Sequence, residues 1–196
     1  MSNLRNYYQD LLNWEGQPQR VLVREWPNTL RESIEAAFVN AVSKSAVKGS
    51  ICPLNPGSTN QSIGNQVEKY TMAKLGRTIL DFSISLCRGA GYPDQMMIET
   101  ATNRRIPLEV KATSKWDPND SNRRVLTSSS NKLRTQFSDP IYHLLLTVLY
   151  SAQENSATIN AIRLDFLEPT TMVNVRLEAS VNHKILAAGN HYHGII

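Results

Sequence analysis

Two short stretches of the chain place acidic residues and a lysine at a spacing that suits chemistry on a phosphodiester. The first, Gly-Tyr-Pro-Asp, covers residues 91–94, and the second, Pro-Leu-Glu-Val-Lys, covers residues 107–111. The second is predicted to lie on a strand, where successive side chains point to opposite faces. Glu109 and Lys111 therefore share one face, whereas Val110 points to the other, into the core.

The residue types indicate which reaction the two stretches suit. The carboxylates of Asp94 and Glu109 are hard oxygen ligands of the kind that Mg²⁺ prefers, and the carbonyl of Val110 is a candidate third ligand. A metal held there binds a phosphate oxygen and lowers the pKa of a bound water. The ammonium of Lys111 is suited to hold that water and to offset the negative charge that develops during attack. Hydrolysis of a phosphodiester needs these parts.

Each stretch alone also has an ordinary structural interpretation. Glu-x-Lys on a strand is usually an exposed ion pair, and Pro-Asp is usually a turn. Their order, about fifteen residues apart across a predicted hairpin, is much rarer by chance. The apolar setting of Glu109 and Lys111 adds weight, because burying a charge costs free energy unless it is paired or binds a metal.

Helices are expected to precede the strands that position these residues. Helices are predicted over about 2–14, 29–48 and 58–80, with a loop over 49–60 that contains Pro and Gly. Strands rich in β-branched and large apolar residues are predicted over 82–86, 95–99, 106–113, 142–151 and 158–167, with a further candidate over 172–180. Residues 144–150 are nearly all apolar, which is typical of a central strand covered on both faces.

Two of the predicted helices carry further signals. Thr29 and Glu32 fit a capping box at the start of the second helix. The apolar face of that helix is predicted to comprise Leu30, Ile34, Phe38 and Val42. The third helix is predicted to share one face among Ile63, Val67, Tyr70 and Ala73.

The two stretches resemble the motif of the PD-(D/E)xK nuclease superfamily, whose largest group is the type II restriction endonucleases. Pro93-Asp94 matches PD and Glu109-Val110-Lys111 matches (D/E)xK, and the order of elements extends the likeness over about 62–167. The resemblance implies an α/β fold with a central mixed β-sheet flanked by α-helices, Mg²⁺ dependence and 5′-phosphate products. By this match Asp94 and Glu109 bind the metal, and Lys111 positions the attacking water.

Members of this superfamily often place a further acidic residue on a helix before the hairpin. Glu68 lies at a suitable position, next to Val67 on the third predicted helix. The alternative is that Glu68 is an exposed residue that pairs with the neighbours of Met72 or contacts solvent. Glu99 is another acid near the motif and is more simply an ordinary strand residue.

Positive charge is concentrated around and after the motif. Residues 104–134 contain eight Lys or Arg and three Asp or Glu, whereas the whole chain has a net charge of only +4. Beside a nuclease motif this stretch is predicted to contact DNA phosphates or base edges, although a solvated surface loop is the plain alternative. The candidate DNA contacts are Lys115, Arg123, Arg124, Ser128, Ser129, Ser130, Lys132 and Arg134.

Length and composition limit the remaining possibilities. The 196 residues are expected to form one nuclease domain, with a helical part over about 1–80 and a catalytic sheet over about 81–170. No apolar run approaches the roughly 20 residues of a membrane span. Two cysteines and a start unlike a signal peptide predict a cytoplasmic protein, and the resemblance implies a prokaryotic one. His183, His191 and His193 lack regular ligand spacing and are not predicted to bind metal.

These observations favour a Mg²⁺-dependent endonuclease that cuts double-stranded DNA at a short, palindromic site. Such sites suit a homodimer, and the N-terminal helices, which carry apolar faces, are the candidate contact between its subunits. Two alternatives stay open. One is a structure-directed nuclease of repair or recombination from the same superfamily. The other is a DNA-binding protein without catalytic activity, which acids beside a bound phosphate argue against, since they repel it unless a metal intervenes.

Overall fold

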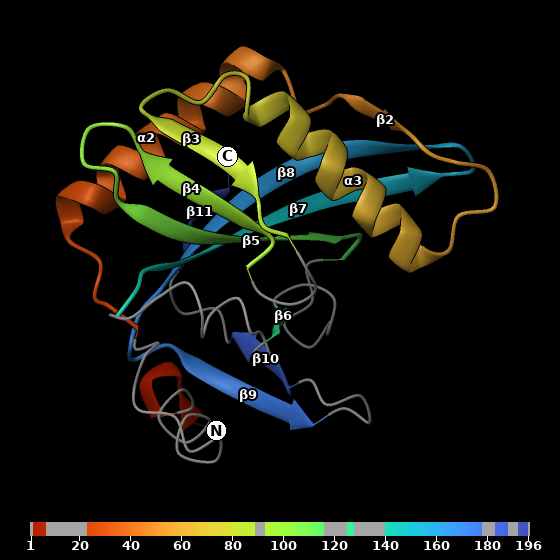
Figure 1. Cartoon of the computed structure of the whole chain (residues 1–196). Coiled ribbons are helices and arrows are strands. Elements are labelled where there is room, and N and C mark those ends of the chain that lie inside the picture. The colour runs from red at the N-terminus through yellow and green to blue at the C-terminus, as the bar shows by residue number, and fades with distance from the viewer. Residues whose placement is uncertain are drawn as a thin grey trace.

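The computed structural model has an α/β architecture built around a mixed β-sheet, which confirms the predicted fold class (Figure 1). The structure describes residues 2–6, 23–88, 93–115, 125–127, 140–177, 183–187 and 192–195. Only the backbone is described for residues 2, 125–127, 173–177, 183–187 and 192–195. None of the helices described is both long and apolar enough to span a membrane.

The larger sheet has the strand order β11-β8-β7-β5-β4-β3, and β2 also pairs with β8. Its strands are β2 (Ile51–Pro53), β3 (Phe82–Leu86), β4 (Gln95–Glu99), β5 (Arg105–Thr113), β7 (His143–Gln153), β8 (Ser156–Leu167) and β11 (Tyr192–Ile195). Strands β5 and β7 pair in parallel, and the other described strand pairs of this sheet are antiparallel. The predicted strands over 82–167 are all present, and the hairpin of β4 and β5 carries the acidic motif.

Strand β2 lies in the segment that the sequence predicts to be a loop. It is only three residues long and pairs with β8 through Ile51, Cys52 and Pro53. Proline is tolerated there because β2 lies at an edge, where a missing N–H interrupts no further pairing. The prediction of a loop over 49–60 was therefore wrong for these three residues.

Helix α2 (Asn28–Ser45) buries the predicted face of Leu30, Ile34, Phe38 and Val42. Its start differs from the prediction. Pro27 is the N-cap and no side chain caps the helix, so Thr29 already lies inside the first turn and cannot act as the N-cap of a capping box. The helix ends at Ser45 because Ala46 adopts a left-handed conformation, three residues before the predicted end near Lys48.

Helix α3 (Asn60–Leu75) begins after Thr59, whose side chain accepts a hydrogen bond from the backbone of Ser62. It ends before Gly76, earlier than the predicted Leu80, as expected where glycine weakens the last turn. Val67 is fully buried, but Ala73 is exposed, contrary to the predicted face. The buried face of the helix instead includes Met72 and Leu75.

Both helices pack on one face of the larger sheet. Apolar residues of α2 and α3 belong to one buried cluster with alternate residues of β5 and β7, among them Leu108, Val110 and Leu144. Because side chains alternate along a strand, Glu109 and Lys111 point to the opposite face. On that face β8 buries the ion pair of Arg163 and Asp165, which no pattern in the sequence predicts.

A smaller sheet has the order β1-β9-β10-β6, and Figure 1 shows β9 and β10 apart from the larger sheet. Its strands are β1 (Ser2–Asn3), β6 (Val125–Thr127), β9 (Met172–Leu177) and β10 (His183–Ala187). Residues 2–3 pair with β9 and are not helical, so the helix predicted over 2–14 was wrong at its start. Residues 4–6 are helical, and 7–14 lie outside the described residues.

Candidate active site

The site forms where β5 extends beyond its partner β4. The two strands pair antiparallel from Ile98 opposite Arg105 to Gln95 opposite Leu108. Strand β5 then continues to Thr113 beside β7 alone. The edge of β5 that β4 leaves is open to other donors and acceptors, and the motif residues lie there.

Asp94 directly precedes β4, which places it beside this edge of β5. Its backbone N–H donates to Oε2 of Glu109 at 3.1 Å, and its own Oδ2 accepts from the N–H of Val110 at 3.5 Å. Each acid of the motif is thus held by the segment that carries the other. The two stretches that the sequence separates by the hairpin turn therefore meet at one point.

Lys111 joins the two carboxylates. Its Nζ lies 2.6 Å from Oε1 of Glu109 and 3.2 Å from Oδ2 of Asp94. The side chain of Glu109 is 1% exposed, that of Lys111 is 19% exposed and that of Asp94 is 40% exposed. The site thus runs from a buried carboxylate to one that solvent or a substrate can reach.

The combined effect of burial and neighbouring charges raises the pKa values of both Glu109 and Lys111. Burial raises the pKa of Glu109 to about 7, although the nearby charge of Lys111 acts to lower it. Burial also disfavours the charged form of Lys111, but the negative charges of Glu109, Asp94 and Glu68 outweigh it and raise its pKa. Lys111 is therefore a firmly charged ammonium at neutral pH.

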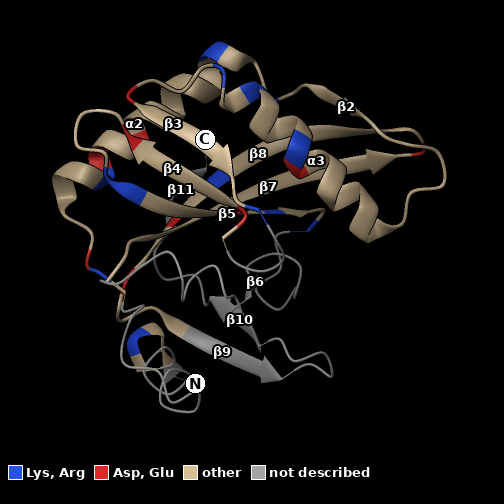
Figure 2. Cartoon of the chain, viewed as in Figure 1, with Lys and Arg blue, Asp and Glu red and all other residues tan. Residues whose placement is uncertain are grey.

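Glu68 reaches the same edge of β5 from helix α3. Its Oε1 accepts the backbone N–H of Ala112 at 3.0 Å, two residues beyond the N–H that Asp94 accepts. Burial raises the pKa of Glu68 to about 7, against the lowering effect of Lys111. In Figure 2, an acidic and a basic position lie next to each other on α3.

The donors at this edge fit a hard divalent cation. The N–H and C=O of one strand residue point to the same edge, so the carbonyl of Val110 faces the side where Asp94 lies. The carboxylates of Asp94 and Glu109 and the carbonyl of Val110 therefore provide three oxygen donors at this edge. In the described part of the chain, no three His, Cys, Asp or Glu side chains group as a metal site. Mg²⁺ suits a set of this size, because it retains several of its waters.

Other predicted residues lie elsewhere. Glu99 is at the far end of β4 and interacts with Thr102 and, at 3.7 Å, with Arg104, so it does not belong to the site. Lys115 is exposed just beyond β5. Seven predicted DNA contacts lie outside the described residues: Arg123, Arg124, Ser128, Ser129, Ser130, Lys132 and Arg134. Of the C-terminal histidines, His191 is not described, and only the backbone is described for the other two.

A cleft of about 500 Å³ adjoins the site and was not predicted from the sequence. Helix α3 lines it with residues spaced about one turn apart, and the end of β3 and the start of β4 complete it. Among its lining residues are Asn65, Lys69, Met72, Ala73, Ile84, Leu86 and Gln95, together with Glu68, Asp94 and Val110 of the site. The spacing of Asn65, Lys69 and Ala73, four residues apart, places them on one face of the helix and was the signal in the sequence that could have indicated this lining.

Comparison with known proteins gives a weak structural likeness. No protein-family model matches the chain, and no curated protein matches it either. Among solved structures, the chain is similar to the restriction endonuclease BglI bound to its DNA recognition sequence, with 12% sequence identity and a TM-score of 0.37. The alignment covers 93% of this chain and 84% of that one. At this TM-score the likeness carries no conclusion about function.

Proposed function

We propose that the protein is a Mg²⁺-dependent endonuclease that hydrolyses double-stranded DNA. The observation that carries the proposal is the bridge that Lys111 makes between Glu109 and Asp94 at an open strand edge. A structural ion pair needs one carboxylate for one ammonium. A second carboxylate, 40% exposed and beside a backbone carbonyl, suits cation binding better than it suits stability.

The proposed roles follow from exposure and charge. Asp94, Glu109 and the carbonyl of Val110 hold the metal. When bound, Mg²⁺ supplies charge neutralisation at the phosphate and lowers the pKa of water. Lys111 orients the attacking water through its ammonium and stabilises negative charge on the phosphate. Glu68, fixed to Ala112, contributes further negative charge next to the cation.

Attack of water on phosphorus breaks the bond to the 3′-oxygen, so the products carry a 5′-phosphate and a 3′-hydroxyl. We propose cleavage at a short, palindromic sequence by a homodimer, because two symmetric sites then act on two symmetric strands. The N-terminal helices were the predicted dimer contact, but the apolar face of α2 is buried in the core of its own chain and does not supply that contact. The predicted contacts over 115–134 would bind the DNA backbone and base edges.

The direct test is to incubate the purified protein with phage-length duplex DNA and Mg²⁺, with EDTA in a parallel reaction. Discrete bands that require Mg²⁺ are expected, and sequencing of the ends would give the site and confirm the 5′-phosphate. A smear would favour the structure-directed nuclease, which shares the metal site but recognises DNA shape. Absence of cleavage with salt-sensitive binding intact would favour the DNA-binding protein and contradict the proposal.

A further inference from the structure

The cleft beside the site is continuous with the groups proposed to act on phosphate. Glu68, Asp94 and Val110 line both. A ligand in the cleft would therefore lie next to a phosphate held at the site. In a DNA strand, the group that lies next to the scissile phosphate is a nucleoside.

The lining of the cleft has the chemistry that a nucleoside needs. Four of its lining residues are apolar, Met72 and Ala73 from α3 and Ile84 and Leu86 from β3. Leu86 is 81% exposed, so its side chain is accessible to a ligand in the cleft. Apolar side chains of this kind can cover the faces of an unstacked base. A volume of about 500 Å³ lies in the range that holds small organic ligands.

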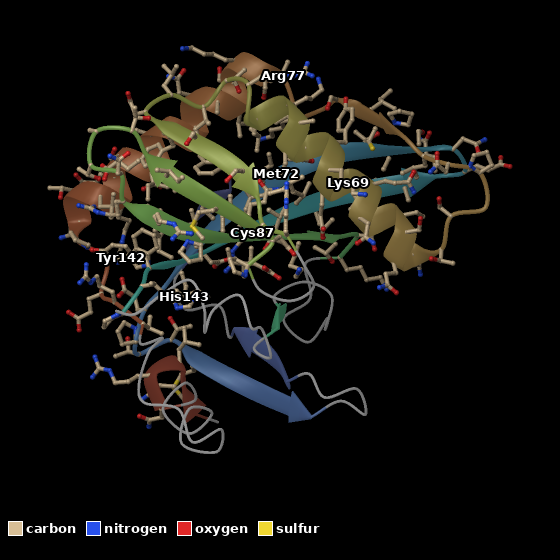
Figure 3. The ribbon with its side chains drawn as sticks, viewed as in Figure 1. Lys69, Met72, Arg77, Cys87, Tyr142 and His143 are labelled. Carbon is tan, nitrogen blue, oxygen red and sulfur yellow. The ribbon has the colours of Figure 1, made fainter. Side chains whose placement is uncertain are left out.

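Polar groups of the cleft match the remaining parts of a nucleotide. Gln95 is 8% exposed and lines the cleft beside Asp94, and its amide offers both a donor and an acceptor to a base edge. Asn65 and Lys69 project from α3 one turn apart. Figure 3 shows Lys69 and Met72 on α3, with Cys87 beyond the end of β3. Lys69 supplies the positive charge that a neighbouring phosphate requires.

We infer that this cleft binds one nucleoside of the cleaved strand out of the base stack, while Lys69 contacts the adjacent phosphate. The inference rests on the proposed nuclease function and adds to it a specific pocket and a form of substrate. Removing a base from the stack costs a few kcal/mol, and this cost is smallest at a mismatch or an unpaired position. The protein should therefore bind a duplex with one unpaired base at that position more tightly than the matched duplex.

Fluorescence of 2-aminopurine tests the inference, because this base brightens when it leaves the stack. Duplexes would carry it at successive positions across the mapped cleavage position, or, without cleavage, across the duplex bound most tightly in Ca²⁺. Saturating wild-type protein in Ca²⁺ should brighten one position. Ala73→Phe should fill the cleft, abolish this signal and weaken DNA binding about tenfold, near the lower end of the cost of losing one stacked base.

Matched variants outside the cleft show whether an effect on DNA binding arises in the cleft or from the substitution itself. Ala36→Phe makes the same change at an exposed position of α2 and should retain the signal and the affinity. Lys69→Gln should reduce the salt dependence of binding, whereas Lys74→Gln, whose ammonium lies over Tyr70, should not. Cleavage without a bright position, or a full signal in Ala73→Phe, would overturn the inference and leave the nuclease intact. A bright position without cleavage would support the cleft and overturn the nuclease.

Discussion

The backbone N–H of Asp94 donates a 3.1 Å hydrogen bond to Oε2 of Glu109, 15 positions further along the chain. The bond forms because β4 begins at Gln95, immediately after Asp94, and pairs only as far as Leu108. The protein scaffold thus holds both carboxylates at one strand edge by hydrogen bonds of its own. Such prior placement lowers the cost of ordering the groups when a cation and a phosphate bind.

Replacing Lys111 with methionine should impair turnover far more than DNA binding. The long apolar side chain keeps the packing of the stem, but the ammonium that contacts Glu109 and Asp94 is lost. Loss of one group that stabilises developing charge typically costs about 10²–10³-fold in rate. Single-turnover cleavage and anisotropy in Ca²⁺ would measure the two effects. Equal losses in both would indicate a binding role for Lys111 and not the proposed role in the reaction.

Two substitutions of Glu68 should separate its structural role from its charge. Glu68→Gln keeps an oxygen to accept the N–H of Ala112, so the free energy of unfolding should barely change. The Mg²⁺ concentration needed for half-maximal cleavage should rise about 10–100-fold, as is usual when a neighbour of a metal ligand is altered. Glu68→Ala should in addition lose about 1–3 kcal/mol of stability, the cost of a buried donor without its acceptor.

Urea unfolding of each variant and a Mg²⁺ titration of cleavage would measure these effects. If Glu68→Gln cleaves with an unchanged Mg²⁺ requirement, Glu68 acts only as an acceptor for the backbone of β5.

His143 should make stability sensitive to mild acid. It is fully buried, and burial lowers its pKa to about 3 from an ordinary value of 6.5. Between these values the unfolded chain binds a proton that the folded chain does not, so the contribution of His143 to stability falls as the pH drops below 6.5, opposite in sign to the contributions of Glu68 and Glu109, whose pKa values burial raises to about 7. The loss is about 1.4 kcal/mol per pH unit, or about 2 kcal/mol at pH 5.

His143→Gln removes the titrating group, so its free energy of unfolding relative to that of the wild type should rise by about 2 kcal/mol between pH 7 and pH 5, whatever its effect on stability at pH 7. Urea midpoints measured between pH 7 and pH 5 would compare the two proteins. The same dependence of the urea midpoint on pH in both proteins would show that His143 does not contribute to it.

Lys115→Ala should weaken DNA binding and reduce its dependence on salt. The residue is exposed, two positions beyond the end of β5, near the strand that carries the proposed site. Loss of one phosphate contact should lower the magnitude of the slope of log K against log salt by about 0.9. Lys48, exposed after α2, provides a matched control whose substitution should leave the slope unchanged. An unchanged slope in Lys115→Ala would exclude this phosphate contact.

The central hairpin could be predicted because its signals are local. Alternation along β5 places Glu109 and Lys111 on one face and Val110 in the core, and the structure has this arrangement. Glu68 could be proposed from its position on the helix before the hairpin. The pairing register, however, decides that β4 stops opposite Leu108, and no local pattern reveals where a partner strand ends.

Features that depend on distant segments were missed. Strand β2 forms because β8 offers it an edge, although its own sequence is typical of a loop. The buried pair of Arg163 and Asp165 lies within a strand that the sequence predicts correctly, but their burial depends on what covers that face. The capping box failed because Pro27 begins helix α2 before Thr29 can cap it. The cleft requires α3 and β3 to be placed side by side, which sequence spacing does not show.

The most direct test of the proposed site compares cleavage by wild-type protein with cleavage by Asp94→Asn and Glu109→Gln in Mg²⁺. Glu99→Gln is the matched control, since it makes the same kind of change on the same hairpin outside the site. Both site variants should lose cleavage by at least about 10²-fold while still binding DNA in Ca²⁺, and the control should cleave as the wild type does. Cleavage by Asp94→Asn or Glu109→Gln at the wild-type rate would contradict the assignment of these carboxylates.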